Sequence, residues 1–380
     1  MSRTVVVAGL AVVGLMLLAS LSYGTATPAA TVGTAACSGG SVSAKIGSRH
    51  RCLRAGQQCK ARFNKQFHRY GFHCFNGRLQ HWVLLPSAGK VVATIRLHSG
   101  PIGAVSSGGA VWVAEHEAGT VARIDPATNT VVARVDIPSG QPARLAAGPE
   151  GLWHLPYSDN TLQELDPAAN TVSTNISSIG EPGENCCMLA VGAGSVWVPK
   201  AHDGVYRVDA HTHAVVAHVA IPNFDGSAFG YGSLWGASGG DVFRLDPATN
   251  SISARIPVPG LAKVAIEPGC CPAYGVGLGA VWVAAGAKVA RIDPATNGIA
   301  KLIRTPGRID FLATTDDAVW AVGQSSTLMT TLWRIDPASN KVVASLPLAR
   351  NDAADLVAGS GSLWVTFFRD DKLLRIQPKR

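Results

Sequence analysis

The stretch P-A-R-L-A-A-G-P-E-G-L-W-H-L-P-Y-S-D-N-T-L-Q-E-L-D-P-A-A-N-T-V-S-T-N-I-S-S, residues 142–178, contains one complete structural repeat. It divides into four short runs, each of the length of a β-strand. The small residues of the first run suit an innermost strand, where strands crowd around an axis, and the β-branched and aromatic residues of the later runs suit outer strands. The stretch therefore predicts one four-stranded blade.

The tryptophan of the second run recurs with a regular period along the chain. Successive copies lie 41, 44, 38, 47, 38 and 44 residues apart. A period near 40 residues with four strands per unit is typical of a β-propeller. We therefore predict an all-β, seven-bladed β-propeller over residues 89–380. The seven positions are Trp112, Trp153, Trp197, Trp235, Trp282, Trp320 and Trp364.

A second motif, D-P-A-T-N, links the third and fourth runs of most units. Aspartate in the first turn position accepts backbone N–H groups, proline presets φ in the second, and asparagine tolerates a left-handed conformation. Turn chemistry therefore accounts for these aspartates, and we do not interpret them as catalytic. The copies are Asp125–Asn129, Asp166–Asn170, Asp246–Asn250, Asp293–Asn297 and Asp336–Asn340, with a degenerate copy at Asp209–His213.

The two ends of the repeat region complement each other. The seventh unit stops at K-L-L-R-I-Q-P-K-R and lacks an outer strand. A matching run, K-V-V-A-T-I-R-L at Lys90–Leu97, precedes the first complete unit and resembles Lys341–Leu348. We expect Lys90–Leu97 to supply the missing strand, because such closure leaves no open sheet edge.

The N-terminus has the order of a secretory signal peptide, which we place at residues 1–30. Arg3 precedes an apolar run from Val5 to Leu21, and small residues follow. We therefore expect an exported protein, secreted or held in the cell envelope, with no transmembrane anchor in the mature chain. A lipoprotein signal ending at Cys37 is the less favoured alternative, since that cysteine lies far beyond the apolar run.

The net charge of +8 belongs to the segment 37–81. This segment has nine Lys or Arg residues and no Asp or Glu, whereas residues 82–380 contain 23 basic and 25 acidic residues. Export and small size predict two disulfides among its four cysteines, and all three pairings stay open. A basic exported module is suited to an anionic cell-envelope polymer, or it is a cap with no specific partner. We expect no specific nucleic acid. The cysteines are Cys37, Cys52, Cys59 and Cys74.

Two further cysteine pairs stand in similar loops before inner strands: Cys186-Cys187 and Cys270-Cys271. Vicinal disulfides, a cross-link between the two loops and zinc binding are the alternatives. The cross-link requires Cα atoms within about 7 Å across the fourth blade. Zinc sites usually space their cysteines by two to four residues, so adjacent cysteines fit zinc least well.

The repeat departs from its consensus mostly in the loops of one face, where His, Asp, Glu and Arg gather. Convergent polar groups above a central channel are a usual ligand site. We therefore predict a small-molecule or protein ligand on this face and a monomeric protein. No cofactor is predicted, although Glu115, His116, His202 and Asp203 are a possible divalent-metal set. The predicted binding residues are Glu115, His116, Arg144, Tyr157, Lys200, His202, Asp203, Asp310, Asp355 and Arg369.

The pattern W-V, then V-x-R-I-D-P-A-T-N, then V-V-A-x-I resembles bacterial YVTN-type propeller repeats. Residues 89–380 also resemble the seven-bladed group that contains the streptogramin (virginiamycin B) lyases. That resemblance implies an inner-strand histidine and Mg²⁺-binding acidic residues. Here no inner strand begins with histidine, and only Trp112–Glu115 matches the W-x-x-E position. We therefore favour an exported binding protein, with a lyase or hydrolase of this group as the alternative.

Overall fold

The structure is a computed structural model in which two compact units, Met1–Val83 and Leu84–Arg380, are each described by themselves. In the part of the chain that is described, no helix is long and apolar enough to cross a membrane. The described residues are 37, 41–75, 77–81, 85–138, 141–157, 159–180, 188–200, 203–261, 273–325 and 328–379.

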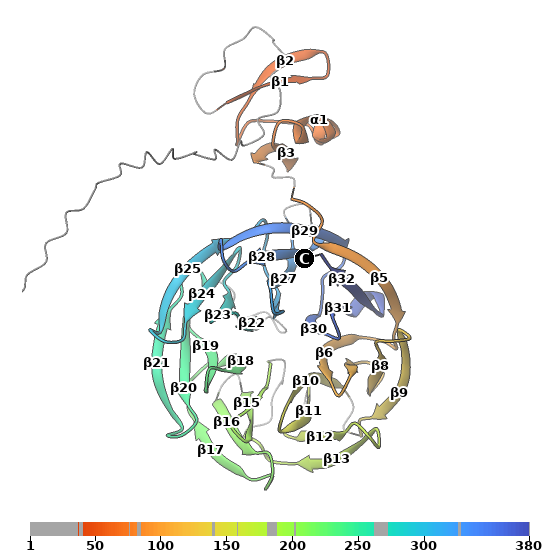
Figure 1. Ribbon diagram of the computed structural model, residues 1–380, viewed down its shortest axis with the longest axis vertical. Helices are drawn as coiled ribbons and strands as arrows, with labels where there is room; N and C mark the ends of the chain where they lie inside the picture. The colour runs from red at the N-terminus through yellow and green to blue at the C-terminus, as the bar shows by residue number, and fades with distance from the viewer. Residues whose placement is uncertain are drawn as a thin grey trace, which may run out of the picture. The chain divides into compact units, whose positions relative to one another are not determined.

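Seven four-stranded antiparallel sheets surround a common axis in the larger unit (Figure 1), and we number them as blades 1 to 7. The prediction of a seven-bladed β-propeller is thus confirmed. Blades 1 to 3 are β6 (Pro101–Ser107), β7 (Ala110–Glu115), β8 (Thr120–Asp125), β9 (Thr130–Asp136); β10 (Pro142–Gly148), β11 (Gly151–Pro156), β12 (Leu162–Asp166), β13 (Thr171–Ile176); and β14 (Ala190–Gly192), β15 (Ser195–Lys200), β16 (Gly204–Asp209), β17 (Val215–Val219).

The other four blades repeat this order from the axis outward, except that the outermost strand of blade 7 comes from the beginning of the propeller. They are β18 (Asp225–Gly230), β19 (Ser233–Ser238), β20 (Asp241–Asp246), β21 (Ser251–Pro257); β22 (Tyr274–Gly277), β23 (Ala280–Ala284), β24 (Lys288–Asp293), β25 (Gly298–Arg304); β26 (Phe311–Thr314), β27 (Val319–Gln324), β28 (Thr330–Asp336), β29 (Lys341–Ala349); and β30 (Asp355–Gly359), β31 (Ser362–Phe367), β32 (Lys372–Pro378), β5 (Gly89–Arg96).

The repeated tryptophans fill the seams between blades. Each is at most 1 % exposed on the second strand of its blade. Trp153 of blade 2, for example, packs in one cluster with Val196 and Val198 of blade 3. Burial of such a large apolar side chain contributes on the order of 2–3 kcal/mol. The period seen in the sequence is therefore the period of the inter-blade core.

Strand β5 closes the ring as expected. It pairs antiparallel with β32, with Arg96 opposite Lys372 and Thr94 opposite Leu374. The last blade thereby gains the outer strand that its own sequence lacks, and every blade is complete. The closing strand runs Gly89–Arg96, within one residue of the expected Lys90–Leu97.

The D-P-A-T-N segments form the expected turns. In the first copy, Ala127 N–H donates to Asp125 Oδ1 at 2.8 Å and Thr128 Oγ1 donates to Asp125 Oδ2 at 2.9 Å. Asn129 adopts φ = 58°, and His213 adopts φ = 62° in the degenerate copy. The carboxylates therefore hold turns, which confirms the structural interpretation of these aspartates.

The arginine of R-I-D-P links neighbouring blades, which the sequence alone did not reveal. Arg244 of blade 4 stacks on Trp235, with its guanidinium carbon 5.0 Å from the ring centroid. The same guanidinium donates from Nη1 to Pro294 O at 2.7 Å and to Asn297 Oδ1 at 2.9 Å, both in the turn of blade 5. Equivalent links start from Arg123, Arg207, Arg291 and Arg375.

Blades 2 and 6 do not make this link to the next blade, for reasons visible in the structure. Blade 2 has Glu164 in place of the arginine, and its carboxylate lies 3.4 Å from Nε2 of His213 in the degenerate turn of blade 3. Blade 6 finds no D-P-A-T-N turn in the next blade, because the outer strand of blade 7 is β5. Arg334 of blade 6 therefore turns to Asp317 of its own blade, at 3.1 Å.

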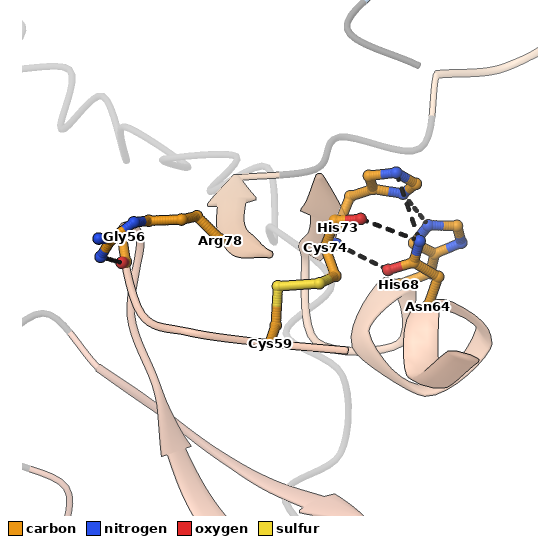
Figure 2. The surroundings of a disulfide bond; sticks show 7 residues. All are labelled: Gly56, Cys59, Asn64, His68, His73, Cys74 and Arg78. Carbon is orange, nitrogen blue, oxygen red and sulfur yellow. Dashed lines mark hydrogen bonds between the residues drawn. A yellow bond between two sulfur atoms is a disulfide. The ribbon is translucent and has the colours of Figure 1, made fainter. Parts of the chain in front are cut away.

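The N-terminal unit is a small module with two disulfides. Cys37 is bonded to Cys52, and Cys59 to Cys74, so the expectation of two bridges is confirmed and one pairing is selected. Asn64 accepts from Cys74 N–H at 2.7 Å and donates to Cys74 O at 3.2 Å (Figure 2). The elements are β1 (Val42–Ile46), β2 (Arg49–Leu53), η1 (Ala61–Phe63), α1 (Asn64–His68), β3 (Phe72–Phe75) and β4 (Arg78–His81).

Several expectations lie outside the described residues. They are the signal peptide at residues 1–30, His202, and the cysteine pairs Cys186-Cys187 and Cys270-Cys271. These stay predictions.

Candidate functional site

A cavity of about 50 Å³ lies where the inner strands begin, at the axis of the propeller. Its wall comes from blades 2 to 7. Arg144, Met188, Tyr274, Phe311 and Asp355 contribute one side chain each from blades 2, 3, 5, 6 and 7. Two of the predicted binding residues, Arg144 and Asp355, therefore line the same cavity.

Arg144 and Asp355 are 3 % and 2 % exposed, so both charges are almost removed from water. Burial raises the pKa of the Asp355 carboxyl, and the positive charge of Arg144 opposes that rise. Asp355 also accepts N–H bonds from Ala104 at 2.9 Å and from Leu356 at 2.8 Å. These bonds hold the carboxylate in place and join blade 7 to blade 1.

Blade 1 separates these two charges without inserting a side chain. Its inner strand has Gly103 at the corresponding position, and a Cβ there would lie 2.3 Å from Ala143 O. Only glycine fits this close approach of β6 to β10. Gly103 therefore lets the inner strand of blade 1 lie close against that of blade 2.

Asp310 stands at the start of the inner strand of blade 6. Its Oδ1 lies 3.0 Å from Arg308 Nε, and its backbone N–H donates to Val322 O at 2.9 Å. Burial raises the pKa of Asp310 to about 6, with Arg308 opposing and Asp352 adding to the rise. This carboxyl therefore changes charge near neutral pH.

Three aromatic rings from blades 1, 2 and 7 meet in the loops of the same face. His116 lies edge-on to Tyr157, with ring centroids 5.3 Å apart, and 6.1 Å from the ring of Phe368. His116 Nδ1 donates to Pro142 O at 3.0 Å, because a carbonyl can only accept. Arg369 is exposed beside Phe368 in the short helix η3 (Phe368–Asp370).

Glu115 lies inside blade 1, completely buried, instead of facing the channel. Its carboxylate accepts from Thr120 Oγ1 at 2.6 Å, His98 N–H at 2.6 Å and Arg134 Nε at 2.9 Å. Burial raises the pKa of Glu115, but these partners together lower it below the usual value. Glu115 therefore joins strands of its own blade and is not placed with His116 and Asp203 around a common point.

Lys200 and Asp203 occupy the corner between blades 2 and 3. Lys200 is 6 % exposed and donates to Asn160 Oδ1 at 3.2 Å. Burial lowers the pKa of Lys200 to about 8, against the opposing charges of Asp159 and Asp203. Asp203 Oδ1 lies 3.2 Å from Nε2 of His218, which stacks on Tyr206. Over the described residues, no three His, Cys, Asp or Glu side chains are grouped to hold a metal ion.

Sequence reasoning missed Met188, Tyr274 and Phe311 as members of the cavity wall. Aligning the repeats with one another would have identified most of the residues that form the wall. Residues 144, 188, 273, 311 and 355 each stand two places before the residue that pairs with the tryptophan of their blade. That position identifies a ring around the channel, whatever residue type occupies it.

Comparisons with known proteins agree with this architecture. A solved structure described as "Streptogramin B lyase structure" aligns with a TM-score of 0.62 at 17 % identity, covering 78 % of this chain and 97 % of that one. The WD40 β-propeller domain of Doa1 aligns with a TM-score of 0.60 at 11 % identity, covering 77 % and 97 %. No family model matches the sequence. No curated protein matches it either. In fold, this chain is a streptogramin-lyase-like seven-bladed β-propeller.

Proposed function

We propose that this protein is an exported binding protein whose propeller takes a ligand at the loop-bearing mouth of its channel. The observation that carries this proposal is the cavity lined by the buried charges of Arg144 and Asp355. Its wall combines charged and apolar side chains, a composition that suits a ligand with polar groups. The ligand can be a free small molecule or the end of a protein segment.

A thermal-shift screen tests this proposal, because any ligand that binds the native state raises the apparent stability. The screen compares the full chain with Arg144→Met across amino acids, sugars, nucleotides and divalent metals. We expect at least one ligand to raise the Tm of the wild type in a concentration-dependent way and to leave Arg144→Met unchanged. If no ligand acts through Arg144, the channel is not the binding site.

Binding is favoured over lyase chemistry by the position of Glu115. The only residue that matches the W-x-x-E position is committed to Arg134, Thr120 and the backbone inside blade 1. Ring opening of a cyclic depsipeptide that requires a divalent metal and disappears in Glu115→Ala would reverse this preference. Glu115→Ala is compared with wild type only after both show the same circular dichroism.

We further propose that the N-terminal module holds the protein on an anionic polymer of the cell envelope. All nine of its basic residues are exposed, and none forms an ion pair with a carboxylate over the described residues. The two disulfides support export, since such bonds persist in oxidising compartments. An uncompensated positive surface attracts polyanions over a distance of about 10 Å at 0.1 M salt.

Binding of the full chain to immobilised polyphosphate and polyglutamate tests the role of the module. Replacing Arg49 and Arg51 by Gln is expected to weaken retention and to lower the salt concentration needed for elution. Replacing Lys301 and Arg304 of the propeller by Gln removes the same charge and is the matched control. An equal loss of retention in both double variants would mean that the N-terminal module contributes no more to polyanion binding than the propeller surface does.

A further inference from the structure

A groove opens on blade 7 beside the end of the strand that closes the ring, and we call it the blade 7 groove. It is lined by Thr94 and Arg96 of β5, Asp370 of η3 and Lys372 of β32. The two strands pair so that Arg96 lies directly opposite Lys372. Directly opposite side chains have Cβ atoms about 5 Å apart, and like charges in this arrangement repel each other. The groove therefore concentrates positive charge between the two outermost strands of blade 7.

One carboxylate holds Lys372 in place and leaves Arg96 uncompensated. Lys372 Nζ donates to Asp370 Oδ2 at 2.6 Å and lies 4.8 Å from the centroid of the Phe367 ring. Asp370 also accepts from the side-chain amide of Asn351, in the connection from blade 6. Arg96 is exposed, and its side chain forms no hydrogen bond or ion pair in the part of the chain that the structure describes. Two cations and one carboxylate leave the wall of the groove with a net charge of +1.

The hydrogen-bond donors of the groove are of three kinds. The guanidinium of Arg96 offers two parallel N–H groups, and the ammonium of Lys372 has three donors, one of which Asp370 uses. Thr94 precedes Arg96 by two residues in the same strand, so its hydroxyl lies on the same face. A phosphate group presents at least three strong acceptor oxygens, whereas a carboxylate has two. Phosphate can therefore accept from all three side chains at once.

We propose that the blade 7 groove binds a phosphate group between Arg96 and Lys372, with the hydroxyl of Thr94 as a third donor. An anion in this place replaces the repulsion between the two cations by attraction to both. The phosphate group can belong to a free ion or to an ester. This site shares no residue with the wall of the channel cavity and none with the N-terminal module, so it is independent of the proposed function.

Blade 5 contains the same pair of cations without the hydroxyl. Lys288 and Arg304 lie directly opposite each other at the first position of the third strand and the last position of the outer strand. Leu302 stands two residues before Arg304, where blade 7 has Thr94. Arg304 is exposed like Arg96 and is therefore the matched control for the removal of one charge from such a pair.

Calorimetry on the full chain tests the proposal in low-salt buffer, where exposed charges are least screened. The probes are inorganic phosphate, glycerol 3-phosphate and acetate. We expect both phosphates to bind and acetate to bind at least about tenfold more weakly, since it cannot use all three donors. Tighter binding of inorganic phosphate than of glycerol 3-phosphate assigns the site to the free ion, and equal or tighter binding of the ester assigns it to a phosphate group on a larger molecule.

Two variants assign phosphate binding to the groove. Arg96→Gln is expected to weaken it at least about tenfold, because a charge-assisted contact is lost. Thr94→Val keeps the shape and the charge of the protein, so diffuse attraction of anions is unchanged, and the loss of one hydrogen bond is expected to weaken phosphate binding at least about threefold. Arg304→Gln and Thr171→Val, at an exposed outer-strand threonine of blade 2, are the matched controls and should bind phosphate like the wild type.

Melting curves are measured first, and all four positions are exposed, so the variants are expected to fold. Unchanged phosphate affinity in either Arg96→Gln or Thr94→Val overturns the proposal. Equal weakening in Arg96→Gln and Arg304→Gln, acetate binding as tight as phosphate binding, or no phosphate binding by the wild type also overturns it. None of these results bears on the ligand screen through Arg144 or on the retention of the module, so the two sets of proposals stand or fail separately.

Discussion

At the scale of single residues, His154 is a titratable side chain that lies outside the cavity. It is completely buried in β11, and its Nδ1 lies 3.0 Å from Gln163 Oε1, whereas its buried Nε2 has no hydrogen-bond partner. Burial lowers the pKa of His154 to about 4, although Gln163 and Asp159 oppose that change. The folded protein therefore requires the neutral imidazole.

The pKa of His154 predicts an acid-dependent loss of stability. Between about pH 6.5 and 4 the unfolded chain binds a proton that the folded chain does not, so stability falls as pH falls through this window. The full effect is on the order of 3 kcal/mol. Asp310 acts in the opposite sense, because its raised pKa lowers stability as pH rises towards about 6.

Urea unfolding at pH 7.5 and 4.5 isolates the contribution of His154. His154→Gln is expected to lose less stability on acidification than the wild type, since glutamine does not titrate. His50→Gln, which removes an exposed histidine, is the control and should behave like the wild type. The same acid dependence in His154→Gln and wild type would contradict this account.

Glu115 gives a second prediction at this scale. Glu115→Gln keeps the shape of the side chain but removes the charge that faces Arg134 and two other donors. We expect a loss of about 1–3 kcal/mol, below the cost of breaking a fully buried pair because Arg134 is partly exposed. The ligand-induced rise in Tm should persist in this variant. Loss of that rise without loss of stability would place Glu115 in the binding site.

At the scale of elements, the seams between blades depend on the linking arginines. Arg244→Ala removes a cation–π contact and two hydrogen bonds to blade 5, and we expect a cost of about 1–3 kcal/mol. Arg334→Ala removes an arginine with the same repeat position that contacts Asp317 of its own blade, so it should cost less. Chemical denaturation of both variants measures the difference.

The seam between blades 2 and 3 offers a double-mutant cycle. Glu164→Arg alone would face His213, and His213→Asn alone would remove the imidazole partner of Glu164. Together they recreate the arginine–asparagine link of the other seams. We therefore expect each single variant to be less stable than wild type and the double variant to recover about 1 kcal/mol or more. Strict additivity of the two changes would show that these positions do not interact.

At the scale of the whole molecule, the ring is closed by contacts between parts distant in sequence, and three of them lie at the last blade and the cavity wall. Strand β5 pairs with β32, Ala104 N–H donates to Asp355 at 2.9 Å, and Thr366 Oγ1 donates to Ile102 O at 3.2 Å. All three join the two ends of the propeller. Ring closure therefore stabilises both the last blade and the part of the cavity wall that Asp355 forms.

Proline substitutions in two matching outer strands test closure. Ala93 lies opposite Arg375, and Ala133 lies opposite Arg123 at the same place in blade 1. Both variants disturb one ladder position, but only Ala93→Pro acts on the strand that closes the ring. We expect Ala93→Pro to cost about 1 kcal/mol or more beyond Ala133→Pro and to speed hydrogen exchange in β30 to β32. Equal losses of stability in the two variants would mean that ring closure contributes no stability beyond that of a single pair of residues in a sheet.

The seven blades, the turns and the closing strand were predictable from the amino-acid sequence, because each depends on local chemistry that repeats. A buried tryptophan, a proline with fixed φ and an asparagine in a left-handed turn impose the same geometry in every copy. The matching runs Lys90–Leu97 and Lys341–Leu348 made the closing strand visible for the same reason. Two disulfides were equally predictable from composition, but their pairing was not.

Which polar residues line the cavity became clear only once the chain was seen folded. Glu115 and Arg144 looked alike in sequence, each a charged residue in a repeat, yet one joins strands inside blade 1 and the other lines the cavity. Their difference depends on which side of a strand faces the axis and on neighbours more than 200 residues away, such as Asp355 beside Ala104. Local pattern does not encode those distances, because the cavity exists only after six blades bring their inner strands together.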